Sequence, residues 1–588
     1  MSRQPQRPPG HARPDNRRPS GSIPSVREFS PAHGLPDAAS GPWSQEPLAV
    51  PPDDHGSGRS PLQHVVREAS TGDQPAAGQA DVAAGWLGRS LTSRGWPLLA
   101  VLSVQAALSL RLLRSNTAFE DEALYLWSGH LQIAHLVHHA QIPDFRSDFS
   151  GAPVIYPPIG ALADSVGGLV GARLLSLVFM LISTILLHGV THRIFSSRAS
   201  AFFAAALFVG VGSVQFLGAF ATYDAMALML VAFATWLTVR AASCRHTGAT
   251  LALLAAGAVV LVLANATKYA STIFDPVVIA VATLAAWRVR GYFIGLQAGV
   301  AMIAASTILL FAALYIAGPA YAQGIKFSTL NRASASDPAL SVLYAGARWI
   351  GIVAILCLIG AVVIWRAWRN APSIALACTL GTAAFLVPFE QARIHTYTSL
   401  FKHVGYGAWF AAIAGGYVLA TLPRAIRAWK GRWTLGAGVI AVIFAAWLGH
   451  GMATTQYRDW PNSSALIAAL GKYEVPGSRY LVEDYDVPAY YLRKQVQWYQ
   501  WSNTWSFTYT DPGSHEVLQN ESAYASAIRH RYFNAIVLAF WDTYPMDQVI
   551  KKDIARYGGY HLVTIIPFHT KAGSSTYDIW TRLQPTRR

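Results

Sequence analysis

The stretch 292-YFIGLQAGVAMIAASTILLFAALYI-316 runs for 25 residues without a charged side chain. A helix needs about 20 mostly apolar residues to cross the hydrocarbon core of a bilayer. The sequence therefore predicts a transmembrane helix here and, by the same criterion, about ten more. These other predicted spans lie near residues 96–113, 169–194, 199–218, 224–241, 249–266, 270–287, 341–365, 373–389, 405–422 and 433–453.

The composition of the whole chain agrees with a membrane protein. Of its 588 residues, 53% are hydrophobic and only 13% are charged, and the mean hydropathy is +0.29. A soluble domain carries about 25% charged residues, so an ordinary soluble enzyme is excluded. The three cysteines, Cys244, Cys357 and Cys378, form no closely spaced pair, and the sequence therefore indicates neither a zinc site nor a disulfide scaffold.

The net charge of +15 comes from 46 basic and 31 acidic residues. Alternate short loops between the predicted spans carry basic residues and no Asp or Glu. Such loops are typical of the cytoplasmic side, so we expect a multi-pass protein of the cell membrane, with a cytoplasmic N-terminus and the C-terminal part outside. The positive charge then indicates orientation rather than binding to nucleic acid. The basic residues of these loops are Arg193, Arg198, Arg240, Arg245, Arg288, Arg290, Arg366, Arg369, Arg424, Arg427, Lys430 and Arg432.

The two ends of the chain differ from the apolar middle. Residues 1–93 hold 14 of the 32 prolines and no long apolar run, a composition that predicts a disordered cytoplasmic tail. Residues 94–454 form the predicted transmembrane domain. Residues 455–588 are more polar and predict a small extracytoplasmic α/β domain. Its expected strands are 478–485, 534–541 and 560–567, and its expected helices are 463–473, 522–532 and 546–557. The predicted fold class is thus mostly α.

Acidic residues cluster directly after the first predicted span. Glu120, Asp121 and Glu122 are consecutive and begin a stretch with helical spacing. They suit a helix N-terminus, where the dipole favours negative charge. They also suit a general base acting on a hydroxyl group, with a neighbouring carboxylate that orients it or holds a cation. Asp224, at the start of the fourth span, has the same two interpretations, as a helix cap or as a functional carboxylate.

Some cations depart from the loop pattern, because they lie on the predicted outer side. Lys268 follows the fifth span, and either snorkels to the interface or binds phosphate. Arg393, Lys402 and His403 lie in an outer segment, where they contact lipid headgroups or a phosphate ligand. Arg332 and Lys326, in another outer segment, are weaker candidates. Aromatic residues of the C-terminal part suit either sugar stacking or a core: Trp498, Tyr499, Trp501, Trp505, Phe507 and Tyr509.

Four short motifs occur in order along the chain. They are Asp121-Glu122, Tyr156-Pro157-Pro158, Gly171-Ala172-Arg173-Leu174 and Ala221-Thr222-Tyr223-Asp224-Ala225. Together with the topology they resemble the GT-C membrane glycosyltransferases, of the glycosyltransferase 39 and 83 types (protein O-mannosyltransferase and aminoarabinose transferase), over about residues 95–455. The resemblance implies a sugar donor carried on a polyprenyl phosphate. It also implies inverting transfer, at the outer face, to a hydroxyl of a protein, lipid or cell-envelope glycan.

The resemblance also implies roles for residues. Asp121 matches the aspartate that activates the acceptor hydroxyl, with Glu122 in support. Asp224 and Glu120 would orient the acceptor or a metal ion, and a divalent ion at Asp121 and Asp224 is left open. The donor phosphate would be bound by Lys268, Arg393, Lys402, His403 and Arg332.

One departure concerns the sugar. Aminoarabinose transferases commonly carry Glu-Lys before the Pro-Pro motif, where this chain has Ile155 and Tyr156, which argues against aminoarabinose. Two other functions stay open: a transporter or flippase of lipid-linked sugars, and a non-catalytic protein that binds glycan. A transporter would need ionisable groups near helix midpoints, whereas the acids here gather at one side.

Overall fold

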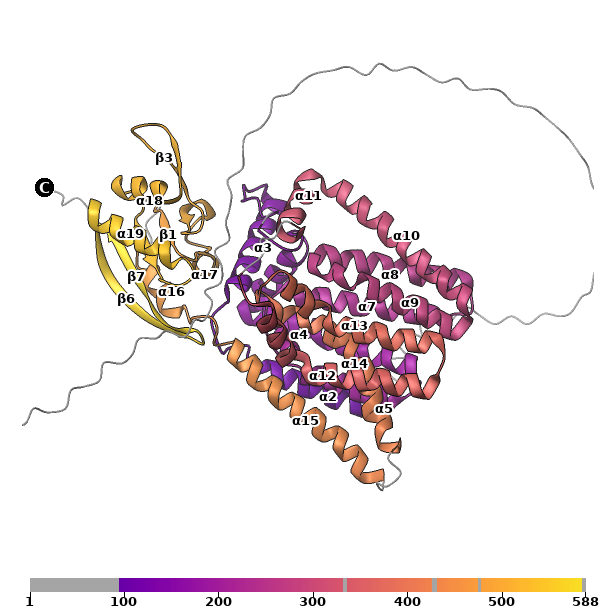
Figure 1. The fold of residues 1–588 in the computed structure, drawn as a ribbon. Helices are drawn as coiled ribbons and strands as arrows, with labels where there is room; N and C mark the ends of the chain where they lie inside the picture. Colours follow the sequence, from indigo (N-terminus) through magenta and orange to yellow (C-terminus); the bar gives the residue numbers. More distant parts are fainter. Residues whose placement is uncertain (1–94, 147, 331–335, 426–430, 474–476, 584–588) are drawn as a thin grey trace, which may run out of the picture. The chain divides into compact units, whose positions relative to one another are not determined.

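The computed structural model describes residues 95–146, 148–330, 336–425, 431–473 and 477–583 (Figure 1). The predicted disordered tail, residues 1–93, lies outside the described residues, and so does Arg332. The division into a tail, a transmembrane domain and a C-terminal domain stays a prediction.

Helices make up most of the described residues between 95 and 456, as predicted. In order they are α2 (Trp96–Leu110), α3 (Glu120–His138), α4 (Tyr156–Phe195), α5 (Arg198–Gly210), α6 (Gly212–Leu217), α7 (Tyr223–Ala242), α8 (Thr247–Thr267), η1 (Tyr269–Phe274), α9 (Asp275–Arg290), α10 (Tyr292–Ala317), α11 (Pro319–Ile325), η2 (Lys326–Leu330), α12 (Ala339–Trp368), α13 (Ala371–Arg393), α14 (Leu400–Ala425) and α15 (Gly431–Gln456).

Among the described residues, nine helical segments are long and apolar enough to cross a membrane. Two shorter apolar helices, α2 and α5, lie at the two remaining predicted spans. The chain is therefore a multi-pass membrane protein. The count of eleven spans stays a prediction, because α2 and α5 are short for a crossing.

Helix α4 shows why the second span was predicted to begin only at residue 169. The helix is interrupted at Gly168, whose φ of 61° and ψ of −160° are not helical. A positive φ is readily adopted only by glycine, so the sequence itself allows the break. Residues before Gly168 form a separate segment that begins with Tyr156 and two prolines at helix-compatible positions.

Helices α7 and α14 form the centre of the bundle, since 78% and 89% of their apolar windows are buried. Small residues make this close packing possible. A Cβ atom on Gly416 of α14 would collide with the backbone of Ala204 on α5, and one on Gly407 would collide with the backbone of Ala383 on α13. By contrast, only 6% of the window of α10 is buried, so α10 lies at the outside of the bundle.

Residues of four of the five basic loops meet at one end of the bundle. Arg193 and Arg240, from different loops, both lie over the ring of Trp236. Arg288 donates to the backbone oxygen of Ile194 at 3.2 Å and lies over the ring of Trp368. These loops are separated along the chain, so their meeting confirms that the helices return the basic residues to one side. That this side is cytoplasmic stays a prediction.

The C-terminal part is a small α/β unit, as predicted. A five-stranded sheet has the order β2-β1-β5-β7-β6, in which β2, β1 and β5 are parallel and β7 and β6 antiparallel. Its elements are α16 (Ser464–Leu470), β1 (Tyr480–Val482), α17 (Asp486–Tyr491), η3 (Trp498–Gln500), β2 (Trp501–Ser502), β3 (Thr508–Thr510), β4 (Val517–Gln519), α18 (Asn520–Arg529), β5 (Ala535–Leu538), α19 (Tyr544–Tyr557), β6 (Tyr560–Thr570) and β7 (Gly573–Arg582).

The sheet packs between two layers. Leu481 and Ile536 belong to a core with Ile528 of α18 and Ile554 of α19. Their neighbours along the strands point the other way, as strand alternation requires, and Val537 joins the larger core that includes residues of α16 and α17. The sequence did not predict α17, η3, β2, β7 or the β3–β4 hairpin.

Asp164 of α4 ties this unit to the membrane helices. Its buried carboxylate accepts hydrogen bonds from Tyr490 at 2.5 Å, from Arg493 at 2.9 Å and from His130 of α3 at 2.6 Å. Helix α17 also packs directly against α3. The C-terminal unit is thereby held along α3, the helix that begins with the acidic run.

Candidate active site

The first turn of α3 fixes the three acids in different directions. Phe119 precedes the helix in an extended conformation, and its backbone N–H donates to Glu122 Oε2 at 3.1 Å. The ring of Phe119 is held by edge contacts with Phe216, Phe220 and Tyr457. Successive helix residues point about 100° apart, so neighbouring acids on this anchored turn meet different surroundings.

Glu122 faces inward and forms a buried ion pair with Arg173. The guanidinium donates to both carboxylate oxygens, at 2.8 and 2.6 Å, and neither side chain is exposed. Arg173 also donates to the backbone oxygens of Leu113, Asn116 and Thr117, so all five of its N–H groups are used. The pair therefore braces the α2–α3 connection against α4.

Glu122 links the two candidate carboxylates. Its Oε1 accepts a hydrogen bond from the backbone N–H of Ala221 at 2.8 Å. Ala221 lies just before Thr222, the N-cap of α7, and Asp224 is in the first turn of that helix. One carboxylate thus connects the turn that carries Asp121 with the turn that carries Asp224. Glu122 is itself paired with Arg173. The predicted support of Asp121 by Glu122 would therefore consist in positioning the two turns.

Asp121 faces a lysine. Lys402 Nζ at the start of α14 lies 2.5 Å from Asp121 Oδ2, and Tyr125 donates to Oδ1 at 2.9 Å. Desolvation disfavours the charged carboxylate, but the charge and hydrogen bond of Lys402 and the hydrogen bond from Tyr125 outweigh it, so the pKa of Asp121 is lowered. The Asp121 side chain is 40% exposed. Its carboxylate therefore lies at an opening rather than in the packed core.

Asp224 lies deeper, with no exposed surface. Its Oδ2 accepts from Thr222 Oγ1 at 2.7 Å, and its Oδ1 lies 3.9 Å from Lys268 Nζ and 3.5 Å from His403 Nε2. Within the described residues Oδ1 accepts no hydrogen bond. Because a buried carboxylate needs compensation, the lysine and the imidazole near Oδ1 are its electrostatic partners.

Lys268 is positioned by the chain segment before α4. The backbone of this segment pairs with the residues around Lys268, through Tyr269 N–H to Ser150 O at 2.8 Å. Lys268 Nζ donates to Ser150 Oγ at 3.1 Å and to Tyr223 OH at 3.3 Å, and it lies 4.5 Å from the centre of the Tyr223 ring. Since Lys268 is only 2% exposed, its ammonium is held in a fixed, dehydrated position.

The helix ends therefore bring Asp121, Asp224, Lys268, Lys402 and His403 into one cluster, which we call the lysine-paired cluster. Two carboxylates, two ammonium groups and an imidazole can hold an anion while a carboxylate accepts a proton. The predicted metal ion at Asp121 and Asp224 stays a prediction. These two residues already have lysine partners, so an ion would need to displace an ammonium group.

Other predicted residues lie apart from this cluster. Arg393 is paired with Glu390 of its own helix at 2.6 Å, and its side chain is 71% exposed. Lys326 is exposed in η2. Glu120 points toward the C-terminal unit, where Asp484 and Asp486 lie. Ile155 and Tyr156, which stand where aminoarabinose transferases commonly have Glu-Lys, lie at the start of α4. Their positions do not identify the sugar.

The sequence analysis missed three members of the site. Tyr125 follows Asp121 by four residues, a spacing that places both side chains on one helix face, and could have been found. Tyr223 precedes Asp224 directly, but its contact with Lys268 is tertiary. Ser150 carried no signal in the sequence.

The aromatic residues of the C-terminal unit do not form one surface. Trp501 is buried and lies 4.9 Å from Tyr480 between ring centres. Phe507 packs on Tyr524 of α18 at 5.3 Å, whereas Tyr499 is 58% exposed. Most of the group is therefore core.

Comparison with solved structures identifies the fold. No protein-family model and no curated protein matches the chain. ArnT from Cupriavidus metallidurans, bound to undecaprenyl phosphate, is similar with a TM-score of 0.55 and 14% identity, over 83% of this chain and 98% of that one. Its apo structure gives a TM-score of 0.54 and 13% identity, over 84% and 98%. The chain has the fold of these GT-C membrane proteins, which confirms the resemblance seen in the sequence.

Proposed function

We propose that this protein is a membrane glycosyltransferase that moves a sugar from a polyprenyl-phosphate donor to an acceptor hydroxyl, with inversion, on the extracytoplasmic face. The observation that carries the proposal is the lysine-paired cluster, in which the partly open carboxylate of Asp121 lies beside two buried ammonium groups. This cluster lies at the end of the bundle away from the basic loops. A crystal structure with the same fold contains undecaprenyl phosphate, which supports a lipid phosphate as the donor carrier.

The reaction needs one base and one site for the leaving phosphate. Asp121 accepts the proton of the acceptor hydroxyl while the acceptor oxygen forms a bond to the anomeric carbon. The bond from that carbon to the phosphate oxygen breaks, and its electron pair leaves with the lipid phosphate. Lys268, Lys402 and His403 offset the negative charge that develops there. A single displacement of this kind inverts the anomeric centre.

The pairing of Asp121 with Lys402 gives the base a way to be activated. Without a donor, the ammonium holds the pKa of Asp121 low, so the carboxylate is charged but weakly basic. An entering phosphate competes for Lys402. As Lys402 turns to the phosphate, Asp121 loses its strongest partner and becomes a better base when the acceptor is in place.

Asp224 has a supporting role in this scheme. It is fully buried beside Lys268 and His403 and keeps both near the place of the leaving phosphate. Arg393 is not needed, because its guanidinium is engaged by Glu390. The phosphate-binding role of Arg332 stays a prediction.

Transfer in liposomes tests the function. The purified full-length protein is supplied with a panel of labelled undecaprenyl-phosphate sugars and with extracts of cell-envelope acceptors. General-base catalysis contributes about 10²–10⁴-fold, so Asp121→Asn should lower turnover by that factor. Asp144→Asn is the matched control, since Asp144 pairs with Arg146 in an exposed loop and its loss should leave turnover unchanged. Equal turnover of wild type and Asp121→Asn would contradict the role of Asp121 as the base.

The same assay separates the two other functions. An enzyme releases undecaprenyl phosphate only when acceptor is added. A flippase moves the labelled lipid between leaflets without cleaving it, and a glycan-binding protein does neither. Acceptor-dependent release of lipid phosphate is therefore the decisive product to measure.

A further inference from the structure

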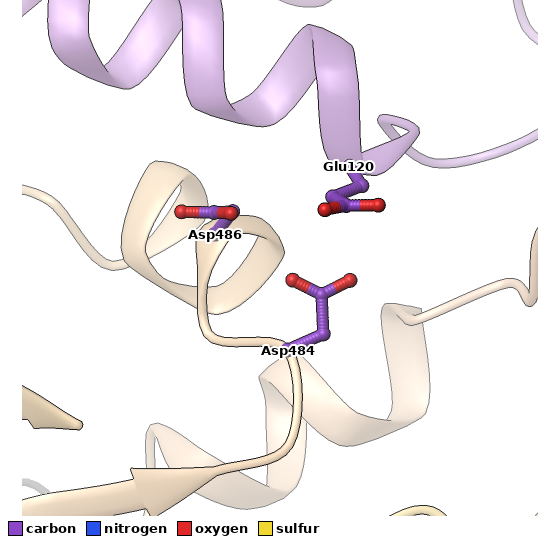
Figure 2. A group of neighbouring side chains, drawn as sticks. All are labelled: Glu120, Asp484 and Asp486. Carbon is purple, nitrogen blue, oxygen red and sulfur yellow. The ribbon is translucent and has the colours of Figure 1, made fainter. Parts of the chain in front are cut away.

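A second group of carboxylates lies one residue away from Asp121. Ligand oxygens of Glu120, Asp484 and Asp486 all lie within 4.8 Å of one another. Figure 2 shows the three side chains converging from α3, from the loop after β1 and from the start of α17. We call this the acid-only cluster, because its members are brought together from two parts of the chain and all are acids.

Asp484 is the member that most needs a ligand. Its Oδ2 is closed off from solvent and, among the described residues, has no hydrogen-bond partner. The two side chains that converge with it, Glu120 and Asp486, are also acids. An enclosed carboxylate surrounded by like charges is unstable unless it binds a proton or a cation.

The position of the cluster in the sheet is one where ligands bind. Asp484 follows β1 and Asp542 follows β5, which are neighbouring parallel strands. The carboxyl ends of parallel strands form a crevice in which α/β folds bind ligands. A separate small cavity of about 30 Å³ borders Asp484 at this edge of the sheet, lined also by Glu483 and Asp542 but by neither Glu120 nor Asp486.

We propose that Glu120, Asp484 and Asp486 bind a hard divalent cation such as Ca²⁺, which joins the C-terminal unit to the first turn of α3. Ca²⁺ binds carboxylate oxygens at 2.3–2.6 Å, so any two ligand oxygens of one ion lie at most about 5.2 Å apart. The three oxygens here all lie within 4.8 Å of one another and can therefore share one ion. Oxygen ligands without sulfur or imidazole also fit a hard cation rather than zinc.

The ion would connect two functions of one helix turn. Glu120 and Asp121 are consecutive in α3, and the ion holds Glu120 while Lys402 holds Asp121. The C-terminal unit would then fix the turn that presents the base. This consequence for Asp121 rests on the proposed transferase, whereas binding of the ion does not and is measured separately.

Binding is tested on the full-length protein in detergent after removal of metals with EDTA. CaCl₂ is titrated while the melting temperature is followed, and Tb³⁺ is titrated as a luminescent probe excited through nearby aromatic rings. We expect Ca²⁺ to raise the melting temperature and to displace Tb³⁺. Both effects should be lost in Asp484→Asn, which stays folded because the substitution removes repulsion.

Two further variants keep the test decisive. Asp486→Asn should weaken both effects if Asp484→Asn cannot be purified. Glu516→Gln is the matched control, because Glu516 is an exposed acid of the same unit, and it should respond to Ca²⁺ like the wild type. The proposal is overturned if Ca²⁺ leaves the melting temperature of the wild type unchanged, or if Asp484→Asn responds as the wild type does. If the wild type binds Ca²⁺ but transfers no sugar, the proposed function is contradicted and the ion site is not.

Discussion

The lysine-paired cluster and the acid-only cluster begin from neighbouring residues and meet opposite surroundings. Asp121 reaches Lys402, while Glu120 reaches Asp484 and Asp486. In the first cluster the protein supplies the positive charge itself, and an incoming phosphate can compete for it. In the second, three acids converge, and the proposed cation would supply the positive charge. Under the two proposals, the surroundings of a carboxylate, more than its residue type, decide whether it acts as a base or binds a cation.

The brace between Glu122 and Arg173 underlies both clusters, and removing it should have the largest effect. Arg173→Met leaves a carboxylate buried without its partner, which costs about 3–5 kcal/mol. We expect a large drop in the thermal unfolding temperature in detergent, with loss of transfer. The double variant Glu122→Gln/Arg173→Met should recover part of this stability, since no charge is then buried alone. No recovery would show that the pair acts independently of charge.

Removing Lys402 tests the lysine-paired cluster directly. Lys402→Met turns Asp121 into a carboxylate without an ammonium partner and removes a charge from the phosphate site. Loss of one preorganised electrostatic contact lowers kcat by about 10²–10³-fold, and we expect a fall of that size in liposome transfer. Lys402→Arg keeps the charge and should retain more activity than Lys402→Met. Similar activity of the two variants would contradict the phosphate role.

The lysine-paired cluster was largely predictable because its members lie at helix ends. Asp224, Lys268 and Lys402 were placed on the outer side by the order of the spans and the basic loops. Helices that cross a layer in alternation return their ends to the same side, so the sequence could bring these residues together. Their roles are still proposals, since position alone assigns none.

Tertiary pairing explains what the sequence could not show. Arg173 and Arg393 are both arginines near predicted outer segments, but only Arg173 meets a buried acid. Glu120, Asp121 and Glu122 are equivalent in the sequence, and their separation depends on the anchored turn of α3. The acid-only cluster was missed because Asp484 and Asp486 lie more than 360 residues from Glu120, where a short loop leads into α17 without a motif.

Neutralising one acid in each cluster should change the melting temperature in opposite directions. Asp224→Asn leaves the buried ammonium of Lys268 without its carboxylate and should lower the melting temperature. Asp484→Asn removes repulsion and should raise it when no divalent ion is present. Each change is expected to be about 1–3 kcal/mol, measured in EDTA on the full-length protein. Shifts of the same sign would show that the two clusters do not differ in charge balance.

Glu483 and Asp547 represent a third way to hold buried acids, in which Asp547 carries a proton. Glu483 accepts backbone hydrogen bonds from Ala539, Trp541 and Thr543 at 2.8–3.4 Å, which stabilise its charged form. Burial and the neighbouring charge of Glu483 raise the pKa of Asp547 to about 10. Asp547 has no exposed surface, so at neutral pH it carries the proton.

The effect of pH on this pair is the smallest that we predict. An acid whose pKa is raised on folding stabilises the fold below its unfolded pKa, near 3.8, and this stabilisation is lost as pH rises through the folded value. Between pH 8 and 9 the folded state binds one more proton at Asp547, so stability should fall by at most about 1.4 kcal/mol. Asp547→Asn should flatten this part of the pH profile of the melting temperature. A slope equal to that of the wild type would mean that Asp547 is charged, and that the acids of this unit depend on a cation rather than on a proton.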